Sequence, residues 1–351
     1  MIVCPQCGNL SNSCNSDDFQ PMPSPLRASS DFRTREAARI YGLRTELFSP
    51  AACQSLCRDH HHLDAGFEEE NIYNGFRQDA LEFFKARKIK WHGSGSCDTS
   101  IVSSQTACLN CFFPFTDDPV ALKSWLSNLY PDLAEVLPVS SELEPPLTSG
   151  RQPYVTFEWI GERNYLNERW GSRGQNCTSV DVMFRFRTVE NKIHVVIAEW
   201  KYCESDEKAK YQRISSSGTD RVATYRPHLS ASGCQISLGS VRFEDLFFNP
   251  IYQFMRQQLL ASAMEREREM DADAVSVLHI APRANEGLLN LALSQKVAPG
   301  ATVGEVWSTI AKHDRFKSIV TEDLIPLLVQ SGADPAWVEY VDKRYGAIGV
   351  A

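Results

Sequence analysis

The clearest alternation of apolar and polar positions in the chain lies within residues 178–202. Two runs rich in Val, Ile, Phe and Tyr, 178–187 and 193–202, are separated by a polar turn at Glu190–Asn191. Runs of this composition are typical of β-strands, and a short polar segment between two of them predicts a hairpin. The pattern therefore predicts an antiparallel pair of strands near the middle of the chain.

Further elements surround this hairpin in a definite order. The pattern predicts strands at 155–160 and 274–281, and the second is almost wholly apolar, as in a strand buried on both faces. Asn249 and Pro250 favour a helix start there, because Asn can cap a helix and Pro suits its first position. With a further helix at 101–113, the order is helix, three strands, helix, strand. This order predicts a mixed α/β fold with additional helices at both ends.

The remaining segments are predicted to be helical or polar. Apolar positions at helical spacing predict helices at 33–47, 70–88 and 120–130, and about three or four amphipathic helices within 286–346. Residues 204–238 form a polar stretch without such a pattern. We therefore expect the long N-terminal part to pack on the sheet as helices.

Three charged residues, Asp181, Glu199 and Lys201, are predicted to meet on one face of the hairpin. If Thr188 pairs with Lys192, the register sets Asp181 opposite Glu199, where Cβ atoms lie roughly 4.5–5.5 Å apart. Because side chains alternate between faces, Glu199 and Lys201 share a face. A cross-strand ion pair of little consequence is the alternative. The apolar surroundings favour a chemical role, because unpaired charges are costly to bury.

Two carboxylates at that distance repel each other unless a positive charge lies between them. Mg²⁺, or Mn²⁺ in its place, is the simplest candidate, because Mg²⁺ takes oxygen ligands and is held by one or two carboxylates plus waters. The backbone carbonyl of Trp200 would supply a further ligand. Lys201 would then orient or deprotonate the attacking water, or balance charge on a phosphate.

The arrangement resembles a known nuclease motif. Asp181, followed on the next strand by Glu199-Trp200-Lys201, is similar to the D…(D/E)xK signature of the PD-(D/E)XK nuclease superfamily, with Val180 where the motif has Pro. Other segments, within about residues 75–347, resemble a bacterial subfamily of these nucleases: Ser103-Ser104-Gln105, Glu158–Arg163, Arg256-Gln257-Gln258-Leu259-Leu260 and Leu278-His279-Ile280-Ala281-Pro282.

This resemblance implies a restriction-endonuclease-like αβββαβ core with a central mixed sheet. It also implies a Mg²⁺-dependent phosphodiesterase, an endonuclease whose substrate is DNA. Asp181, Glu199 and the Trp200 carbonyl would bind the metal, and Lys201 would position the attacking water. Glu158 would be the third acid of the site.

The resemblance suggests further assignments around this centre. Glu162 is the second choice for the third acid. Gln258 is placed near the metal-binding carboxylates, whereas the helical pattern alone leaves open a core Gln satisfied by backbone. Basic substrate contacts are expected in the 164–177 loop, which contains Arg169 and Arg173, with a solvated loop as the alternative.

Eleven cysteines, an odd number in a long chain, favour metal binding or free thiols over disulfides. Cys4 and Cys7 resemble the first knuckle of a zinc ribbon, and Cys53 and Cys57 form a second close pair. Four thiolates, or thiolates plus an imidazole from His60–His62, would close a tetrahedral structural Zn²⁺ site. The alternative is free thiols at the N-terminus and two small buried side chains at the second pair.

Charge and hydropathy narrow the class of protein. A net charge of −8 over 351 residues argues against a basic coat protein for nucleic acid, although a local basic groove remains compatible with it. No apolar run approaches the roughly 18 residues of a membrane span, and the N-terminus lacks the pattern of a signal peptide. We therefore expect a cytoplasmic protein without a membrane partner, and DNA as the substrate is what the resemblance implies. The oligomeric state is left open, with a homodimer as one option.

We divide the chain into four parts on this basis. They are a Cys-containing N-terminal segment and linker (1–35), a mainly helical part that packs on the core (36–153), the PD-(D/E)XK core (154–285) and a C-terminal helical extension (286–351). Two other functions remain open: a catalytically silent protein that binds nucleic acid, and a zinc-ribbon interaction protein. The intact Asp, Glu and Lys set argues against the silent alternative.

Overall fold

The central hairpin is present with the predicted register. In the computed structural model, β5 (Val180–Thr188) and β6 (Ile193–Trp200) are antiparallel, and the Thr188 amide donates to the Lys192 carbonyl over 2.8 Å. The structure describes residues 2–3, 10–11, 31–56, 61–92, 97–169, 171–175, 177–204, 211–215, 218–239, 241–289, 301–312 and 314–348.

The hairpin lies inside a mixed sheet of six strands, so the expected mixed α/β fold is confirmed. The order is β3-β5-β6-β7-β8, and β4 pairs with β5 on the same edge as β3, nearer the start of β5. The β6–β7 and β7–β8 pairs are parallel and the others antiparallel. The other strands of this sheet are β3 (Leu133–Leu137), β4 (Val155–Trp159), β7 (Ala274–Ala281) and β8 (Phe316–Val320), and β1 (Ile2–Val3) pairs separately with β2 (Leu10–Ser11).

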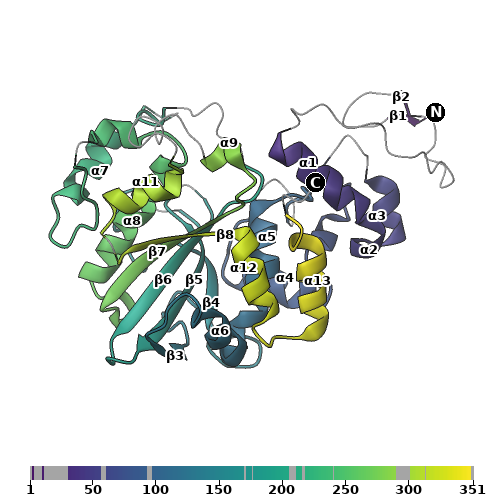
Figure 1. Ribbon diagram of the computed structural model, residues 1–351, viewed down its shortest axis with the longest axis horizontal. Coiled ribbons are helices and arrows are strands. Elements are labelled where there is room, and N and C mark those ends of the chain that lie inside the picture. The colour runs from purple at the N-terminus through teal and green to yellow at the C-terminus, as the bar shows by residue number, and fades with distance from the viewer. Residues whose placement is uncertain are drawn as a thin grey trace.

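Helices cover both faces of the sheet (Figure 1). The helices α7, α8 and α11 lie on one side, and α4, α5, α6, α12 and α13 lie on the other. Their bounds are α1 (Phe32–Gly42), α2 (Arg44–Leu47), α3 (Pro50–Ser55), α4 (Arg77–Ala86), α5 (Ser104–Phe112), α6 (Pro119–Leu126), α7 (Arg221–Leu229), α8 (Ile251–Arg266), α9 (Glu286–Leu289), α11 (Val303–Ile310), α12 (Thr321–Val329) and α13 (Pro335–Tyr345). Short 3₁₀ helices are η1 (Glu68–Asn71), η2 (Phe113–Thr116), η3 (Phe243–Leu246) and η4 (Glu269–Asp271).

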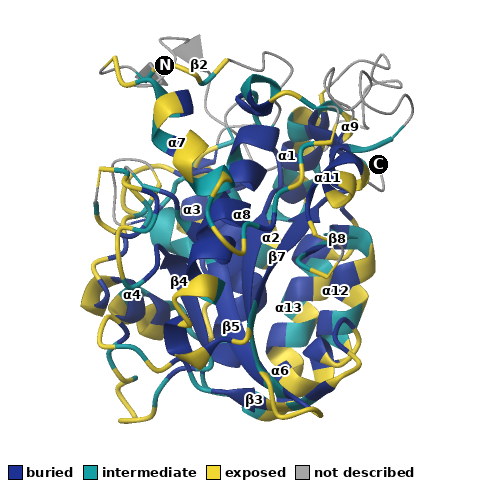
Figure 2. Ribbon diagram, turned by 90° about the vertical axis from the view of Figure 1, so that its left-hand side faces the viewer, coloured by how far each residue is buried: buried dark blue, intermediate teal, exposed yellow. Residues whose placement is uncertain are grey.

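Alternation along β6 divides the core into two clusters. Val196 and Ala198 pack with the cluster that contains α4, α5 and α13, whereas Val195 and Ile197 pack with α8 and α11. Figure 2 shows that the strands between these clusters are buried along most of their length. Because successive side chains point to opposite faces, Glu199 falls on the face that α8 covers.

Several segments differ from the expected structure. The helix expected at 70–88 is interrupted between η1 and α4, where the Asn110 side chain accepts the Tyr73 backbone N–H over 2.9 Å and replaces a helical partner. The tail expected to be wholly helical contains β8, which extends the central sheet, and the polar stretch at 204–238 contains α7. None of the described helices combines the length and apolar character of a membrane span.

Candidate active site

Three acidic residues, one on each of three neighbouring strands, lie in register across the sheet. Glu158 of β4 is opposite Asp181 of β5, because the residues on either side of Glu158 pair with those on either side of Asp181. Asp181 is in turn opposite Glu199 of β6, because the preceding pair on the hairpin is Val182 with Ala198. We call Glu158, Asp181 and Glu199 the carboxylate row.

Asp181 and Glu158 are oriented by hydrogen bonds. Oδ2 of Asp181 accepts the Trp200 backbone N–H over 2.7 Å. Oε1 of Glu158 accepts from the Gln105 side chain over 2.8 Å, and its Oε2 accepts from the Ser179 hydroxyl over 2.7 Å. Glu158 is only 3% exposed, and its φ of 51° lies in the left-handed region. Backbone of this kind is uncommon for a non-glycine residue and clusters at functional sites.

Glu199 is held between a lysine and a glutamine. The Lys201 ammonium lies 2.6 Å from Oε1 of Glu199, and the Gln257 side chain of α8 donates to its Oε2. Lys201 is fixed at its backbone too, because its N–H donates to the Ile280 carbonyl of β7 over 2.7 Å. Lys201 and Glu199 are therefore a buried, preorganised ion pair at the end of β6.

The carboxylate row carries more negative charge than its surroundings compensate. Burial raises the pKa of Asp181 well above its usual value, and the charges of Glu199 and Glu158 raise it further. Burial likewise raises the pKa of Glu158. Burial disfavours the charged form of Lys201, but Glu199, Glu204 and Asp181 outweigh that effect and raise its pKa, so the ammonium is retained. A divalent cation would relieve this excess of negative charge.

The donor set fits a hard cation. No three His, Cys, Asp or Glu side chains form a metal cluster in the described part of the chain. A cation at the carboxylate row would therefore rely on Asp181, Glu199, backbone oxygen and water, which is the oxygen-rich and partly hydrated shell that Mg²⁺ prefers. The Trp200 carbonyl already accepts from the Ser104 hydroxyl over 2.9 Å, and its second lone pair is the one that a metal would use.

The start of α5, which lies on the other side of the sheet from α8 (Figure 1), contacts Glu158 and the Trp200 carbonyl. The Ser103 hydroxyl caps α5, Ser104 binds the Trp200 carbonyl, and Gln105 binds Glu158. Gln105 also accepts the His92 backbone N–H over 2.8 Å, and the His92 imidazole, 51% exposed, lies 3.6 Å from Glu158. Ser103-Ser104-Gln105 thus contacts both Trp200 and Glu158, and the exposed His92 lies on the solvent side of Glu158.

The assignment of Gln258 to the carboxylates is wrong. Its amide donates to the Gln235 side chain over 2.6 Å and to the Arg315 carbonyl over 3.0 Å, and it accepts from Trp307 of α11. Gln257 is the residue that reaches Glu199. Successive residues on a helix point in directions about 100° apart. Because α8 is buried on several sides, a buried-stripe pattern cannot tell which of the two glutamines faces the strands.

A family comparison bears on this geometry. A model of the family described as Restriction Endonuclease associating with ARP (REase-ARP) matches residues 28–346. The chain belongs to the REase-ARP family. No curated protein and no solved structure matches it. The REase-ARP match contains the whole carboxylate row, α5 and α8, and it agrees with a restriction-endonuclease-like family.

Arg173 does not form the basic substrate contact expected in the 164–177 loop of this REase-ARP chain. Its guanidinium donates to Glu144 over 2.9 Å and to the Thr156 hydroxyl over 2.5 Å, and it also binds the Glu158 carbonyl over 3.3 Å. Arg173 is buried, whereas Arg169 is exposed. Arg173 therefore supports the backbone of the carboxylate row, and Arg169 alone of the two can reach a solvent-borne phosphate.

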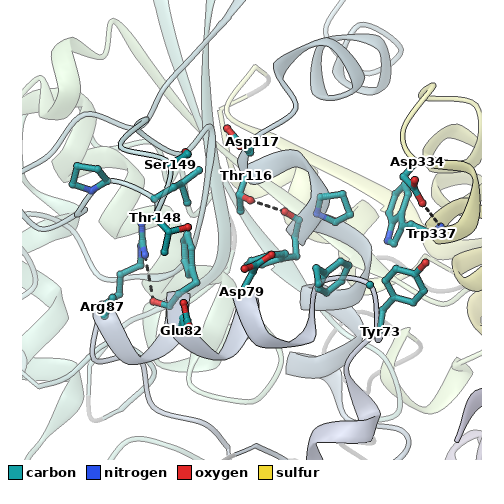
Figure 3. A pocket seen from close by; sticks show the side chains of 18 residues that line it. Tyr73, Asp79, Glu82, Arg87, Thr116, Asp117, Thr148, Ser149, Asp334 and Trp337 are labelled. Carbon is teal, nitrogen blue, oxygen red and sulfur yellow. Dashed lines mark hydrogen bonds between the residues drawn. The ribbon is translucent and has the colours of Figure 1, made fainter.

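A separate cavity lies beside α4 in the REase-ARP segment. Figure 3 shows this cavity, about 580 Å³, bordered by α4 and by residues 146–149. None of its lining residues belongs to the carboxylate row. Arg87 lines it, but its guanidinium donates to Glu144 and to the Pro145 carbonyl and so is not free to bind a phosphate. The cavity is therefore not part of the candidate active site.

The zinc hypothesis falls mostly outside the described residues. Cys4, Cys7 and Cys57 are not described, and Cys4 and Cys7 also precede the REase-ARP match. Cys53 lies on α3, where its thiol donates to the Arg44 carbonyl over 3.2 Å and burial raises the pKa of that thiol.

If the four cysteines bind Zn²⁺, purified protein should carry about one zinc per chain, because closed structural sites retain their metal. Elemental analysis of protein purified without chelator measures this content. Replacing Cys4 and Cys7 by Ser should remove the zinc, whereas replacing the buried Cys111, which is far from both pairs in sequence, should not. Zinc-free wild-type protein would contradict the hypothesis.

Proposed function

We propose that this chain is a metal-dependent endonuclease that hydrolyses phosphodiester bonds in DNA. The observation that carries the proposal is the carboxylate row with Lys201 beside it, in a chain of the REase-ARP family. Buried acids that raise one another's pKa are poorly explained as structural elements, because each adds an electrostatic penalty to the folded state.

Asp181 and Glu199 would hold a divalent cation, with the Trp200 carbonyl completing the protein ligands. A bound Mg²⁺ or Mn²⁺ supplies a Lewis acid at the phosphate and lowers the pKa of a coordinated water. Glu158 lies next to Asp181 and would accept a hydrogen bond from that coordinated water or from a second water. The Trp200 N–H keeps Oδ2 of Asp181 in place, so that the carboxylate does not need to reorganise on binding.

Lys201 would act in its protonated form. Because its pKa is raised, its Nζ carries a full positive charge and three donors. Such a group orients the attacking water and neutralises charge on the phosphate, whereas a neutral amine would be required to act as a base. The ion pair with Glu199 fixes the direction in which Nζ points.

The proposal is tested by incubating purified wild-type protein with supercoiled plasmid, linear duplex DNA and RNA. We expect nicking or cleavage of DNA with Mg²⁺ or Mn²⁺, and none in chelator. No cleavage of any of these substrates with either metal would overturn the proposed function. Binding to DNA without cleavage would favour the catalytically silent alternative.

A further inference from the structure

Two buried polar atoms next to Glu199 have no hydrogen-bond partner among the described residues. Gln257 is 3% exposed and His279 is fully buried, yet Oε1 of Gln257 and Nε2 of His279 are both unsatisfied. Leaving a buried polar atom unpaired destabilises the fold, and most such atoms in folded proteins are bound to protein or ordered water. Both atoms are therefore open to a further hydrogen-bond partner between α8 and the sheet.

Both side chains lie beside Glu199 on the side of the sheet that α8 covers. His279 of β7 is the direct parallel partner of Glu199, and neighbouring strands lie about 4.8 Å apart. Gln257 contacts Glu199 from α8, and the His279 ring lies edge-on to Phe254 with ring centroids 4.6 Å apart. Phe254 is three residues before Gln257, a spacing that puts both on one side of the helix.

The hydrogen-bond partners of Gln257 and His279 determine which atom of each side chain remains unpaired. A carboxylate only accepts, so the amide nitrogen of Gln257 must face Glu199 and its carbonyl oxygen must face away. Nδ1 of His279 lies 3.1 Å from the Ser318 hydroxyl of β8, which leaves Nε2 for another partner. A water needs two to four polar partners in a buried site, and these two atoms supply the first two.

We propose that Oε1 of Gln257 and Nε2 of His279 hold a buried water between them and that this bridge fixes the orientation of the Glu199 carboxylate. The inference rests on the proposed function in naming Glu199 as a metal ligand. Gln257 and His279 are then positioning residues, because they act on the metal and the substrate only through Glu199.

Two substitutions of His279 separate its two ring nitrogens. His279→Gln places an amide near the former Nε2, whereas His279→Asn reaches only the position of Nδ1 beside Ser318. We expect His279→Asn to weaken Mn²⁺ binding and to lower kcat by about 10–100-fold, the usual size of such supporting effects, with KM for DNA nearly unchanged. His279→Gln should retain most of both. Gln257→Met, which keeps the volume and deletes the amide, should resemble His279→Asn.

His194 supplies a matched control. It lies at the other end of β6, and its Nε2 is 2.8 Å from the Ser276 hydroxyl. His194→Asn should lower thermal stability without changing Mn²⁺ affinity. If the role of His279 were purely structural, His279→Asn and His194→Asn would have the same fraction folded and would behave alike in every activity measure.

Calorimetric titration measures Mn²⁺ affinity whether or not the protein cleaves DNA. The endonuclease proposal and the proposed support of Glu199 can therefore fail independently. If Mn²⁺ binds more weakly to His279→Asn while wild type cleaves nothing, the water-bridged support stands and the endonuclease proposal fails. If wild type cleaves and all His279 variants bind Mn²⁺ equally, the support is overturned. A crystal structure that shows Gln257 and His279 in direct contact, with no intervening water, would overturn it as well.

Discussion

Asp181→Asn should abolish cleavage while making the metal-free protein more stable. The substitution removes a charge that would bind the cation, and metal ions supply several kcal/mol of transition-state stabilisation, so cleavage should fall by about 10³-fold or more. The folded-state pKa of Asp181 is raised by burial and by its acidic neighbours, so its ionised form destabilises the fold above the unfolded-state pKa. A neutral amide of the same shape removes that penalty and can still accept the Trp200 N–H.

The measurement pairs a plasmid-cleavage assay with thermal unfolding in chelator at neutral pH. Stability gains should appear in the melting temperature at about 2–4 °C per kcal/mol for domains of 150–250 residues. Asp132→Asn, at an exposed position before β3, is the control and should change neither quantity. Cleavage by Asp181→Asn at the wild-type rate would remove Asp181 from the metal site.

Lys201→Met should lose cleavage while keeping metal affinity. An ammonium has no lone pair and cannot bind a metal ion, so the contribution of Lys201 should be confined to the chemical step. Removing one positioned hydrogen-bond donor from developing negative charge typically costs about 10²–10³-fold in rate. Because the substitution removes one positive neighbour from Glu199, affinity for Mn²⁺ should stay the same or rise slightly.

The stability of Lys201→Met must be measured together with its cleavage activity. Breaking a buried ion pair from one side costs about 3–5 kcal/mol in the absence of a new partner, and Lys201 is only 8% exposed. Added Mn²⁺ should restore part of the lost stability, because it neutralises the stranded Glu199. Lys201→Arg, which keeps the charge but changes the donor geometry, should fold better than Lys201→Met and still cleave poorly. If Lys201→Met cleaves like wild type, Lys201 is a structural ion-pair partner and the catalytic assignment of the hairpin fails.

The part of the site that lies on the hairpin could be predicted from local rules. A polar turn and two apolar runs define the register, and the register alone puts Asp181 opposite Glu199. The position of Glu158 could not be obtained in this way, because β4 is separated from the hairpin by a loop. Its place rested on the family resemblance, and the structure puts Glu158 in register with Asp181.

Other parts depend on contacts that a sequence pattern does not contain. Gln257 and Gln258 are both buried, and the choice between them depends on Trp307, which lies on α11 much later in the chain. Strand β8 is five residues long and directly precedes α12, so its short apolar pattern is compatible with either element. The resemblance already includes Ser103-Ser104-Gln105, but the contacts of this segment with Trp200 and Glu158 depend on how α5 packs on the sheet.

The backbone of Glu158 has an evolutionary consequence. A glutamate at a φ of 51° and 3% exposure is conformationally and electrostatically unfavourable, whereas Gly adopts the same backbone with little strain and Asn does so more readily than Glu. Under the proposed function, selection for stability alone would therefore replace Glu158 in any descendant that did not cleave DNA. Among relatives of this chain, we expect Gly or Asn at the position of Glu158 to accompany loss of Asp181, so that a change at this one residue would mark lineages released from catalysis.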